Sequence, residues 1–391
     1  MRSAYGLAAP TCEAALTLVG RGTPMGELMR RYWHPIGLIG DANETPRQIR
    51  VLGEDLILFR DHAGRPGLLH PRCAHRGASL LYGKTEEKGI RCCYHGWLFD
   101  VDGNCLEQPC EPNLGAKTCA RVQQPAYPVE ERYGLIFAYL GPLDRKPLLP
   151  RYNVLEDLEP GEFVEADDSS IGSGGPTIVP CNWLQHFENV MDPFHVPILH
   201  GSFSGVQFNE RMGLMPKVRF EDTMRGIRSL QVRDLGEGRV HRRITEAVLP
   251  AVRAVASPRA TVDGPCSLLG WVLPIDDTSF RIYSAGRVTK ASTLKTIRSH
   301  FNGKLWQELT DAEHRDFPGD YEAQVSQGAI TAHSEEHLVT SDRGIGMLRR
   351  LYREQIKIVE AGGNPMGTAF DPSGELVMLD AGTAVVEAVD A

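Results

Sequence analysis

The sequence has no apolar run long enough to cross a membrane, and its N-terminus lacks a basic start followed by a long apolar core. It also lacks internal repeats and low-complexity segments. Basic residues are in the minority, with 42 Lys and Arg against 50 Asp and Glu and a formal net charge of −8. These features argue against a membrane protein, a secreted protein and a general binder of nucleic acid. We therefore expect a cytoplasmic protein that binds neither membrane nor nucleic acid.

Cysteine is too scattered for a disulfide framework. The nine cysteines are an odd number spread through 391 residues, which leaves metal binding or buried thiols as their uses. Hydrophobic residues make up 42% of the chain and charged residues 24%, as in an ordinary globular protein. At this length two domains are expected.

The pattern of the chain changes after residue 145. Short strand-like runs with turn signals, such as the DVDGN turn at 100–104, predict an antiparallel β domain over 27–145. A linker follows, because prolines interrupt the stretch at 142–150. A helical stretch near 182–200, long strands and an amphipathic helix over 341–363 then predict an α+β domain over 155–391, with 1–26 packed on it.

Two Cys-His clusters lie close together in the β-rich part, in CAHRGA at 73–78 and CCYHGW at 92–97. Two cysteines and two histidines suit either a tetrahedral zinc ion or a two-iron, two-sulfide cluster. A glycine follows each cluster and lets backbone amides approach a sulfide, and the β-rich context is not that of a zinc finger. Neighbouring side chains on a strand point to opposite faces, so only one of Cys92 and Cys93 can be a ligand.

A second group of potential metal ligands lies in NWLQHFENVMDPFHVPILHGSF at 182–203. His195 and His200 are five residues apart, which on a straight α-helix separates them by about 140° around the axis. Pro197 lies between them, and a local bulge or helix end there could turn both imidazoles toward one point. The spacing is compatible with a metal site without requiring one.

Together the two groups resemble the oxygenase (alpha) subunits of the Rieske non-haem iron aromatic ring-hydroxylating oxygenases. C-x-H followed by C-x2-H, within CAHRGASL and YHGWLFD, is similar to the Rieske signature. Glu188-x3-Asp192-x2-His195-x4-His200 resembles the family's mononuclear iron motif. GTPMGELMRRYWHPIG and the WVLPIDD hairpin are similar to the phthalate-dioxygenase-like branch.

The resemblance implies a fold and a set of cluster ligands. The fold is α+β, with an N-terminal antiparallel-β Rieske [2Fe-2S] domain and a helix-grip catalytic domain, in which helices close a curved antiparallel sheet. Cys73 and Cys92 are expected to bind one iron of the cluster, and His75 and His95 the other. The family's second loop has two intervening residues, which makes Cys93 a spare thiol.

The resemblance further implies that His195 and His200 bind a mononuclear Fe(II) together with a distant carboxylate. Candidates for this third ligand are Asp276, Asp277, Glu335, Glu336 and Asp342. The pair at 276–277 is explained as a turn, and the family places its carboxylate at the start of the last helix, which favours Asp342. Asp192 is expected to bridge His195 and, across a subunit boundary, His95 of the partner subunit.

The implied function is that of the terminal oxygenase component of a multicomponent Rieske oxygenase. It would use O2 and supplied electrons to hydroxylate or O-demethylate an aromatic, carboxylated substrate, by mono- or dioxygenation. The chain shows no nicotinamide or flavin fingerprint, so a separate NAD(P)H-dependent reductase, with or without a ferredoxin, would deliver the electrons. The family implies a homotrimer.

Two questions stay open in the sequence. Residues 211–260 hold eleven Lys or Arg against five Asp or Glu, and one or two of these cations are expected to turn inward and bind a substrate carboxylate. The sequence does not say which. The alternative function is a Rieske electron-transfer or ligand-binding protein without oxygenase activity, which would carry two irons per chain instead of three.

Overall fold

The N-terminal part of the protein is built from small antiparallel sheets, in a computed structural model that describes residues 8–111, 115–168, 176–205, 207–257, 262–292, 294 and 304–388. The sheet orders are β1-β10-β9, β2-β3-β4 and β5-β6-β7-β8. The bounds are β1 (Trp33–Leu38), β2 (Arg47–Val51), β3 (Glu54–Arg60), β4 (Pro66–Leu69), β5 (Lys84–Glu86), β6 (Gly89–Arg91), β7 (Leu98–Phe99), β8 (Cys105–Glu107), β9 (Val129–Arg132) and β10 (Leu135–Tyr139). The expected DVDGN turn joins β7 to β8.

The second part is organised around one large antiparallel sheet of order β12-β19-β18-β16-β15-β14-β13, with β21 pairing β15 and β17. Its bounds are β12 (Phe163–Asp167), β13 (Lys217–Asp222), β14 (Gly226–Gly236), β15 (Arg239–Val248), β16 (Val252–Val255), β17 (Gly264–Pro265), β18 (Leu268–Asp276), β19 (Ser279–Val288) and β21 (Gly382–Glu387). A short parallel pair, β11 (Arg151–Tyr152) and β20 (Leu376–Val377), lies apart from it.

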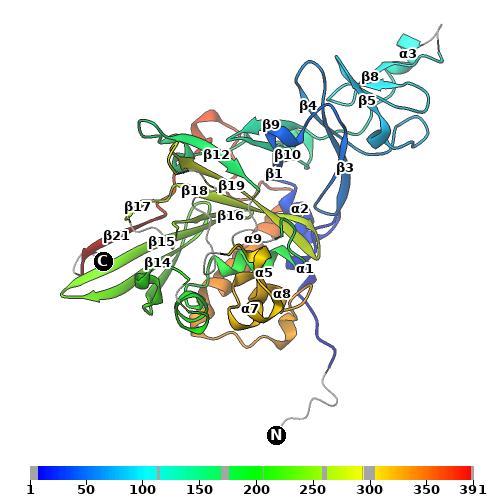
Figure 1. Ribbon diagram of the computed structural model, residues 1–391. Helices are drawn as coiled ribbons and strands as arrows, with labels where there is room; N and C mark the ends of the chain where they lie inside the picture. Colours follow the sequence, from blue (N-terminus) through cyan, green and yellow to red (C-terminus); the bar gives the residue numbers. More distant parts are fainter. Residues whose placement is uncertain are drawn as a thin grey trace.

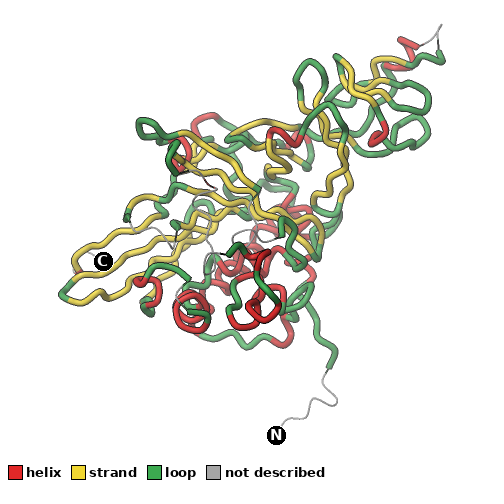
Figure 2. The backbone as a smooth tube through the Cα atoms, in the orientation of Figure 1, coloured by secondary structure: helices red, strands yellow, loops and turns green. Residues whose placement is uncertain are grey.

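Helices gather on one side of this sheet, as Figures 1 and 2 show for α5, α7, α8 and α9. The helix bounds are α1 (Ala14–Thr17), α2 (Pro24–Met29), α3 (Gly115–Cys119), α4 (Asn153–Glu156), α5 (Trp183–Asn189), α7 (Asp311–Asp316), α8 (Asp320–Val325) and α9 (Arg343–Glu360). The predicted final helix is therefore present as α9. It buries the apolar stripe that includes Leu348, Tyr352 and Ile356, and Gly362 follows it with a positive φ.

The hydrophobic core divides into two clusters. The larger runs from α1 and α2 through β1 and β10 to β18 and α9, and the smaller lies among β3, β6 and β7. α1 and α2 both pack against α9, so the described part of 1–26 lies on the second part of the chain. The expected α+β architecture, small antiparallel sheets followed by a curled antiparallel sheet with helices, is confirmed.

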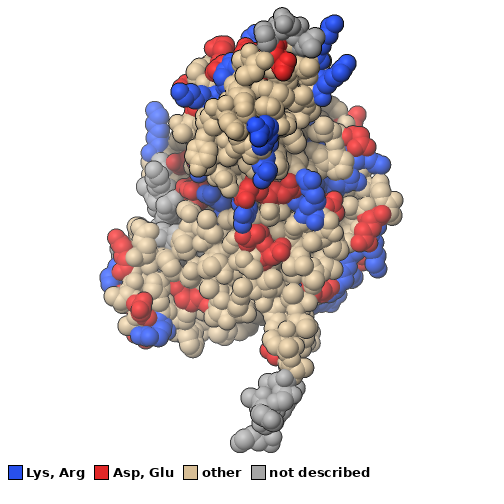
Figure 3. Space-filling view, turned by 90° about the vertical axis from the view of Figure 1, so that its right-hand side faces the viewer, with Lys and Arg blue, Asp and Glu red and all other residues tan. Residues whose placement is uncertain are grey.

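Charge is mixed on the surface that carries the tip of the N-terminal part. Figure 3 views the molecule from this side and shows Lys and Arg interspersed with Asp and Glu. No helix among the described residues is both long enough and apolar enough to cross a membrane.

Candidate functional site

The two Cys-His clusters form twin loops with the same backbone hydrogen bonds. In the first, the Cys73 amide donates to the Ala78 carbonyl at 2.9 Å and the Gly77 amide donates to the Cys73 carbonyl at 2.8 Å. In the second, the Cys92 amide donates to the carbonyl five residues on at 2.9 Å, and the Gly96 amide returns to the Cys92 carbonyl at 3.1 Å. Both glycines have positive φ, 76° and 71°, a conformation that glycine adopts without strain. The loops are therefore equivalent from their first cysteine onward.

This equivalence distinguishes the two adjacent cysteines. Cys92 occupies the position of Cys73, and each is 3% exposed. Cys93 is exposed. Burial therefore favours Cys92 over Cys93 as the second thiol of the Cys-His group.

The imidazoles of the two loops also meet. The His75 and His95 rings lie with their centroids 4.5 Å apart, and Trp97 stacks on His75 at 4.5 Å with 9° between the planes. Burial, helped by the neighbouring Cys92, raises the pKa of the Cys73 thiol to about 11. The loops therefore hold two thiols and two imidazoles in one place, with Trp97 covering one ring.

The spread of these four donors fits two metal ions better than one. Among the described residues, the donors that converge within 4.8 Å of one another are those of His195, His200 and Asp320. The two thiols and two imidazoles of the loops are spread more widely than that. A single tetrahedral zinc ion would draw all four donors to one point. A two-iron cluster takes the thiolates on one iron and the imidazoles on the other, and the donors here suit that arrangement.

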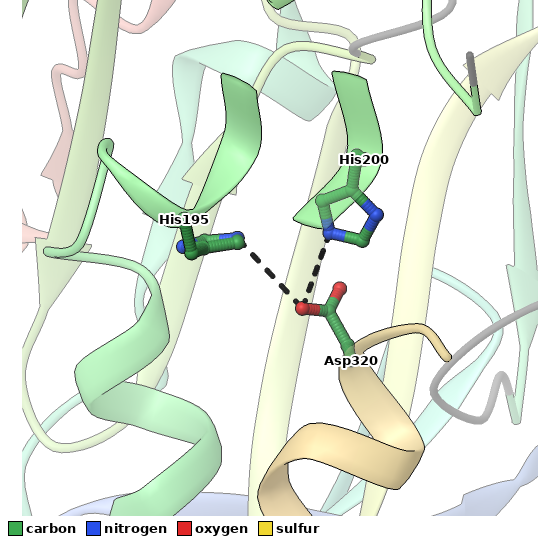
Figure 4. Close-up of side chains that lie close together, drawn as sticks. All are labelled: His195, His200 and Asp320. Atoms are coloured by element: carbon green, nitrogen blue, oxygen red, sulfur yellow. Dashed lines mark hydrogen bonds and ion pairs between the residues drawn. The ribbon is translucent and has the colours of Figure 1, made fainter. Parts of the chain in front are cut away.

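The second centre consists of His195, His200 and Asp320. Nε2 of His200 lies 3.3 Å from Oδ1 of Asp320, and Nε2 of His195 lies 3.7 Å from the same oxygen. Figure 4 shows both rings and the carboxylate pointing toward one another, the rings from one segment and the carboxylate from the start of α8. Two imidazoles and a carboxylate on one side of a site leave open positions on a bound ferrous ion.

The awkward five-residue spacing is resolved by a π-helix. Residues Val196–Phe203 form this π-helix, η4, with Pro197 in its first turn and His195 as its N-terminal cap. Hydrogen bonds in a π-helix join residues five apart, so positions five apart come close to one face. The predicted local bulge near Pro197 is thus present, and it directs the two imidazoles toward each other, with ring centroids 5.4 Å apart.

Neighbouring side chains orient the ligands. Nδ1 of His200 lies 2.7 Å from the side-chain oxygen of Gln207, which leaves Nε2 free to face Asp320. Asn189, whose role the sequence did not reveal, donates to Oδ1 of Asp320 at 3.1 Å. Burial alone would raise the pKa of Asp320, but the nearby histidines, led by His200, lower it. The carboxylate is therefore held ionised and aimed at the imidazoles.

The structure does not bring Asp342, the predicted third ligand, together with His195 and His200. The Asp342 carboxylate accepts the backbone N–H of Val339 at 2.7 Å and closes the turn before α9. Three other candidates are engaged elsewhere: Asp276 accepts from the side chain of Ser279 at 2.8 Å, Asp277 accepts the backbone N–H of Val19 at 2.8 Å, and Glu336 pairs with Arg349. Asp320 takes the place of Asp342.

Asp320 was not among the sequence candidates, although a signal for it exists. It follows Pro318 and Gly319, and the Glu322 side chain accepts the backbone N–H of Gly319 at 2.8 Å, which caps the first turn of α8. Such a pattern marks the start of a helix, so it puts a carboxylate at a helix start, the position expected of the ligand. We expected the ligand at the start of the longer amphipathic helix, α9, and did not predict the six-residue helix α8.

The Asp192 carboxylate contacts both the backbone that follows it and the imidazole of His195. Its Oδ1 accepts the backbone N–H of Phe194 at 3.0 Å, and its Oδ2 lies 3.4 Å from Nδ1 of His195. Nδ1 of His195 is buried, and this 3.4 Å contact is longer than an ordinary hydrogen bond. Although burial opposes ionisation, the contact with His195 keeps the pKa of Asp192 below its ordinary value. The carboxylate is thus charged and still 30% exposed.

Comparisons with known proteins find relatives over nearly the whole chain. A family model described as the Rieske [2Fe-2S] domain matches residues 32–127. The chain is 50% identical over 375 residues, 95% of the chain and 91% of the relative, to the phenoxybenzoate dioxygenase subunit alpha of Ectopseudomonas oleovorans. It is 34% identical, over 92% of the chain and 82% of the relative, to the 5,5'-dehydrodivanillate O-demethylase oxygenase subunit of a Sphingobium strain. The fold resembles that of dicamba monooxygenase bound to dicamba, with a TM-score of 0.60 at 19% identity over 85% of this chain and 99% of that one.

Proposed function

Because the chain belongs to the Rieske non-haem iron oxygenases as an oxygenase (alpha) subunit, we propose that it oxidises aromatic carboxylic acids by hydroxylation or O-demethylation. The family assignment of the sequence is confirmed, and with it the [2Fe-2S] cluster and the mononuclear non-haem iron as cofactors. When bound, these groups supply single electrons and the activation of O2. The substrate class is supported by relatives named for phenoxybenzoate and phthalate.

The observation that supports an oxygenase most directly is the convergence of His195, His200 and Asp320 in a chain that also carries the twin loops. A pure electron-transfer protein has no need of a second ligand set. We assign the second centre to these three residues and the cluster to Cys73, His75, Cys92 and His95. Gln207 and Asn189 hold the ring and the carboxylate in their facing orientations.

A separate electron-donating component belongs to this type of multicomponent system, and we take it to be an NAD(P)H-dependent reductase, with or without a ferredoxin. The working location is the cytoplasm. We keep 27–145 and 155–391 as the proposed domains.

We further propose that the working assembly is a homotrimer. In Figure 1 the tip that carries β5 and β8 lies at one end of the chain, and α5, α7 and α8 lie toward the other end. This separation favours electron transfer from the twin loops of one subunit to the second centre of the next. Asp192, charged and partly exposed beside His195, is then placed to reach His95 of the partner subunit.

The function is tested by turnover of the reconstituted oxygenase with a compatible reductase and NADH. Aromatic acids, their neutral amides and aryl methyl ethers form the panel, with O2 uptake and product analysis as readouts. We expect coupled O2 consumption with at least one aromatic acid. Uncoupled or absent O2 uptake across the panel, in a preparation with full iron content, would reject an aromatic oxygenase.

A further inference from the structure

The sheet carries one face that is polar where a protein interior is usually apolar. In the register of β14 with β15, Gln231 lies opposite Arg243 and Arg233 lies opposite His241. Directly opposed residues of an antiparallel pair share a face, so these four side chains project together. All are buried: Arg233 is 0% exposed, His241 2%, and Gln231 and Arg243 4% each.

This polar face is turned toward the second metal centre. Ala247 lies on the same face, four residues beyond Arg243 on β15, and it pairs with Arg253 of β16. Nη1 of Arg253 lies 3.3 Å from Nε2 of His186, a residue of α5, and the other nitrogen of that ring lies 3.0 Å from the side-chain oxygen of Gln324 in α8. Since α8 begins at Asp320, Arg253 joins this face of the sheet to the helices beside the metal ligands.

The two arginines on this face have no anionic partner. Among the described residues, no carboxylate lies within ion-pair distance of Arg233 or Arg243, whereas buried Arg349 is held by Glu188 and Glu336. The internal segments outside the described residues contain no Asp or Glu. Burial lowers the pKa of each arginine to about 10, and repulsion from Arg243 adds to the lowering at Arg233. Both remain charged at neutral pH.

Their hydrogen-bonding capacity is only partly used. Arg233 donates to the Leu214 carbonyl at 3.1 Å and to the side-chain oxygen of Gln231 at 3.2 and 3.1 Å. Arg243 donates to the Ala256 carbonyl at 2.6 Å and to the Met212 sulfur at 3.6 Å. A guanidinium has five N–H groups, so both cations keep donors for another acceptor.

His241 supplies a second, independent sign of a missing ligand. Its Nδ1 atom is buried and has no hydrogen-bond partner in the described part of the chain. Its Nε2 atom lies 3.9 Å from Asp263, a carboxylate already bound by Arg211 at 3.0 Å. Burial lowers the pKa of His241 to about 4, helped by repulsion from Arg233. The ring is thus neutral at pH 7 and can donate one N–H to an anion. An unpartnered buried polar atom beside two unpaired cations is costly unless an acceptor fills the space.

We infer that Arg233, Arg243 and His241 form the subsite that binds the carboxylate of the aromatic substrate. The inference rests on the proposed function and specifies how the substrate lies: its acid group sits against β14 and β15, and the opposite end of the molecule is presented to His195 and His200. The planar guanidinium fork matches a carboxylate in two parallel hydrogen bonds. The bound acid would also offset the charge that the fold leaves buried.

The test compares an acid with its neutral analogue on the oxygenase with both metal centres loaded. Binding of 3-phenoxybenzoate and of 3-phenoxybenzamide is measured by titration calorimetry on the wild type, on Arg243→Met and on Arg242→Met. Arg242 is the matched control, because it is the next residue on β15 and projects from the opposite face. The wild type is expected to bind the acid more tightly than the amide, and Arg243→Met is expected to lose about 10- to 100-fold in affinity for the acid while its affinity for the amide changes by less than about 3-fold.

Arg243→Lys keeps a buried cation but removes the planar guanidinium that can form two parallel hydrogen bonds. This variant replaces Arg243→Met in the test if the Met variant does not fold. It should lose affinity for the acid alone, by less than the Met variant would. Equal losses of acid and amide affinity, or acid binding in Arg243→Met within about 3-fold of the wild type, would overturn the subsite. Turnover of neutral aryl ethers without any preference for acids would also overturn it while leaving an oxygenase in place. Failure to oxidise any aromatic would instead reject the proposed function itself.

Discussion

Among single residues, Asp320 is decisive for the second metal centre, because it is the carboxylate that both imidazoles face. Asp320→Ala is expected to lose the mononuclear iron, about one third of the iron in the chain, and to keep the visible spectrum of the two-iron cluster. Asp342→Ala is the matched control and should retain all its iron, since that carboxylate only closes a turn. Iron analysis together with the absorption spectrum measures both. Loss of iron in the Asp342 variant with retention in the Asp320 variant would restore the sequence-based assignment.

The adjacent cysteines provide a second matched pair. Cys92→Ala should abolish the visible absorption of the cluster, because its sulfur is buried in the position equivalent to Cys73. Cys93→Ala should leave that absorption unchanged, since the Cys93 side chain is exposed. A colourless Cys93→Ala protein would mean that the loop equivalence does not identify the ligand.

The sequence was sufficient for residues whose spacing is itself the signal, and insufficient for residues that only folding brings near. The loop residues from Cys73 to His95 follow one another within a short segment, so their spacing restricts them to one place. Asp320 stands 120 residues from His200, and nothing local ties it to a metal. The sequence could not identify the inward-facing arginines for a similar reason. The side of the sheet to which Arg243 points depends on the register of β15, which forms only on folding.

At the scale of elements, one buried ion pair joins α5 to α9. Arg349 of α9 donates to both oxygens of Glu188 in α5, at 2.5 and 2.8 Å, and also pairs with Glu336. Arg349→Met would leave the buried Glu188 carboxylate without a cation and is expected to lower stability by about 3–5 kcal/mol. Arg350→Met, the exposed neighbour on the same helix, should change stability by less than about 1 kcal/mol. Thermal unfolding of both variants measures the difference, and similar melting temperatures would show that the pair does not hold α5 in place.

The elements also show which parts of the fold follow from pattern. The predicted amphipathic helix and the turn between β18 and β19 are present because apolar periodicity and turn residues act locally. The π-helix η4 was foreseen only as a local bulge, because Pro197 shows that the α-helical ladder fails without showing what replaces it. Local chemistry thus predicts where regular structure ends better than what form the irregular structure takes.

For the whole molecule, a buried histidine contributes to the dependence of stability on pH. Burial lowers the pKa of His34 from 6.5 to about 4, with its Nε2 atom 2.8 Å from the Met29 carbonyl. Because the folded-state pKa is below the unfolded-state value, the stabilisation is present above pH 6.5 and is lost as pH falls toward 4. Between pH 7 and pH 5 this single group should account for about 2 kcal/mol of lost stability. His34→Gln should flatten the fall in melting temperature over that range, whereas His62→Gln, at a partly exposed histidine, should not.

The assembly determines which centres work together, and mixed oligomers can reveal this. A Cys92→Ser chain lacks a functional cluster loop but keeps His195, His200 and Asp320, whereas an Asp320→Ala chain has the opposite defect. Each variant alone should be inactive. If electrons pass between subunits of a homotrimer, each mixed trimer has one junction in three at which both the donor and the acceptor are intact. The purified mixed oligomers should therefore show about one third of wild-type turnover per chain. Co-expression with two different affinity tags followed by tandem purification isolates the mixed oligomers, and iron analysis confirms their composition. If instead each chain reduces its own centre, no chain in the mixture holds both intact sites, and turnover should stay at the level of the inactive parents.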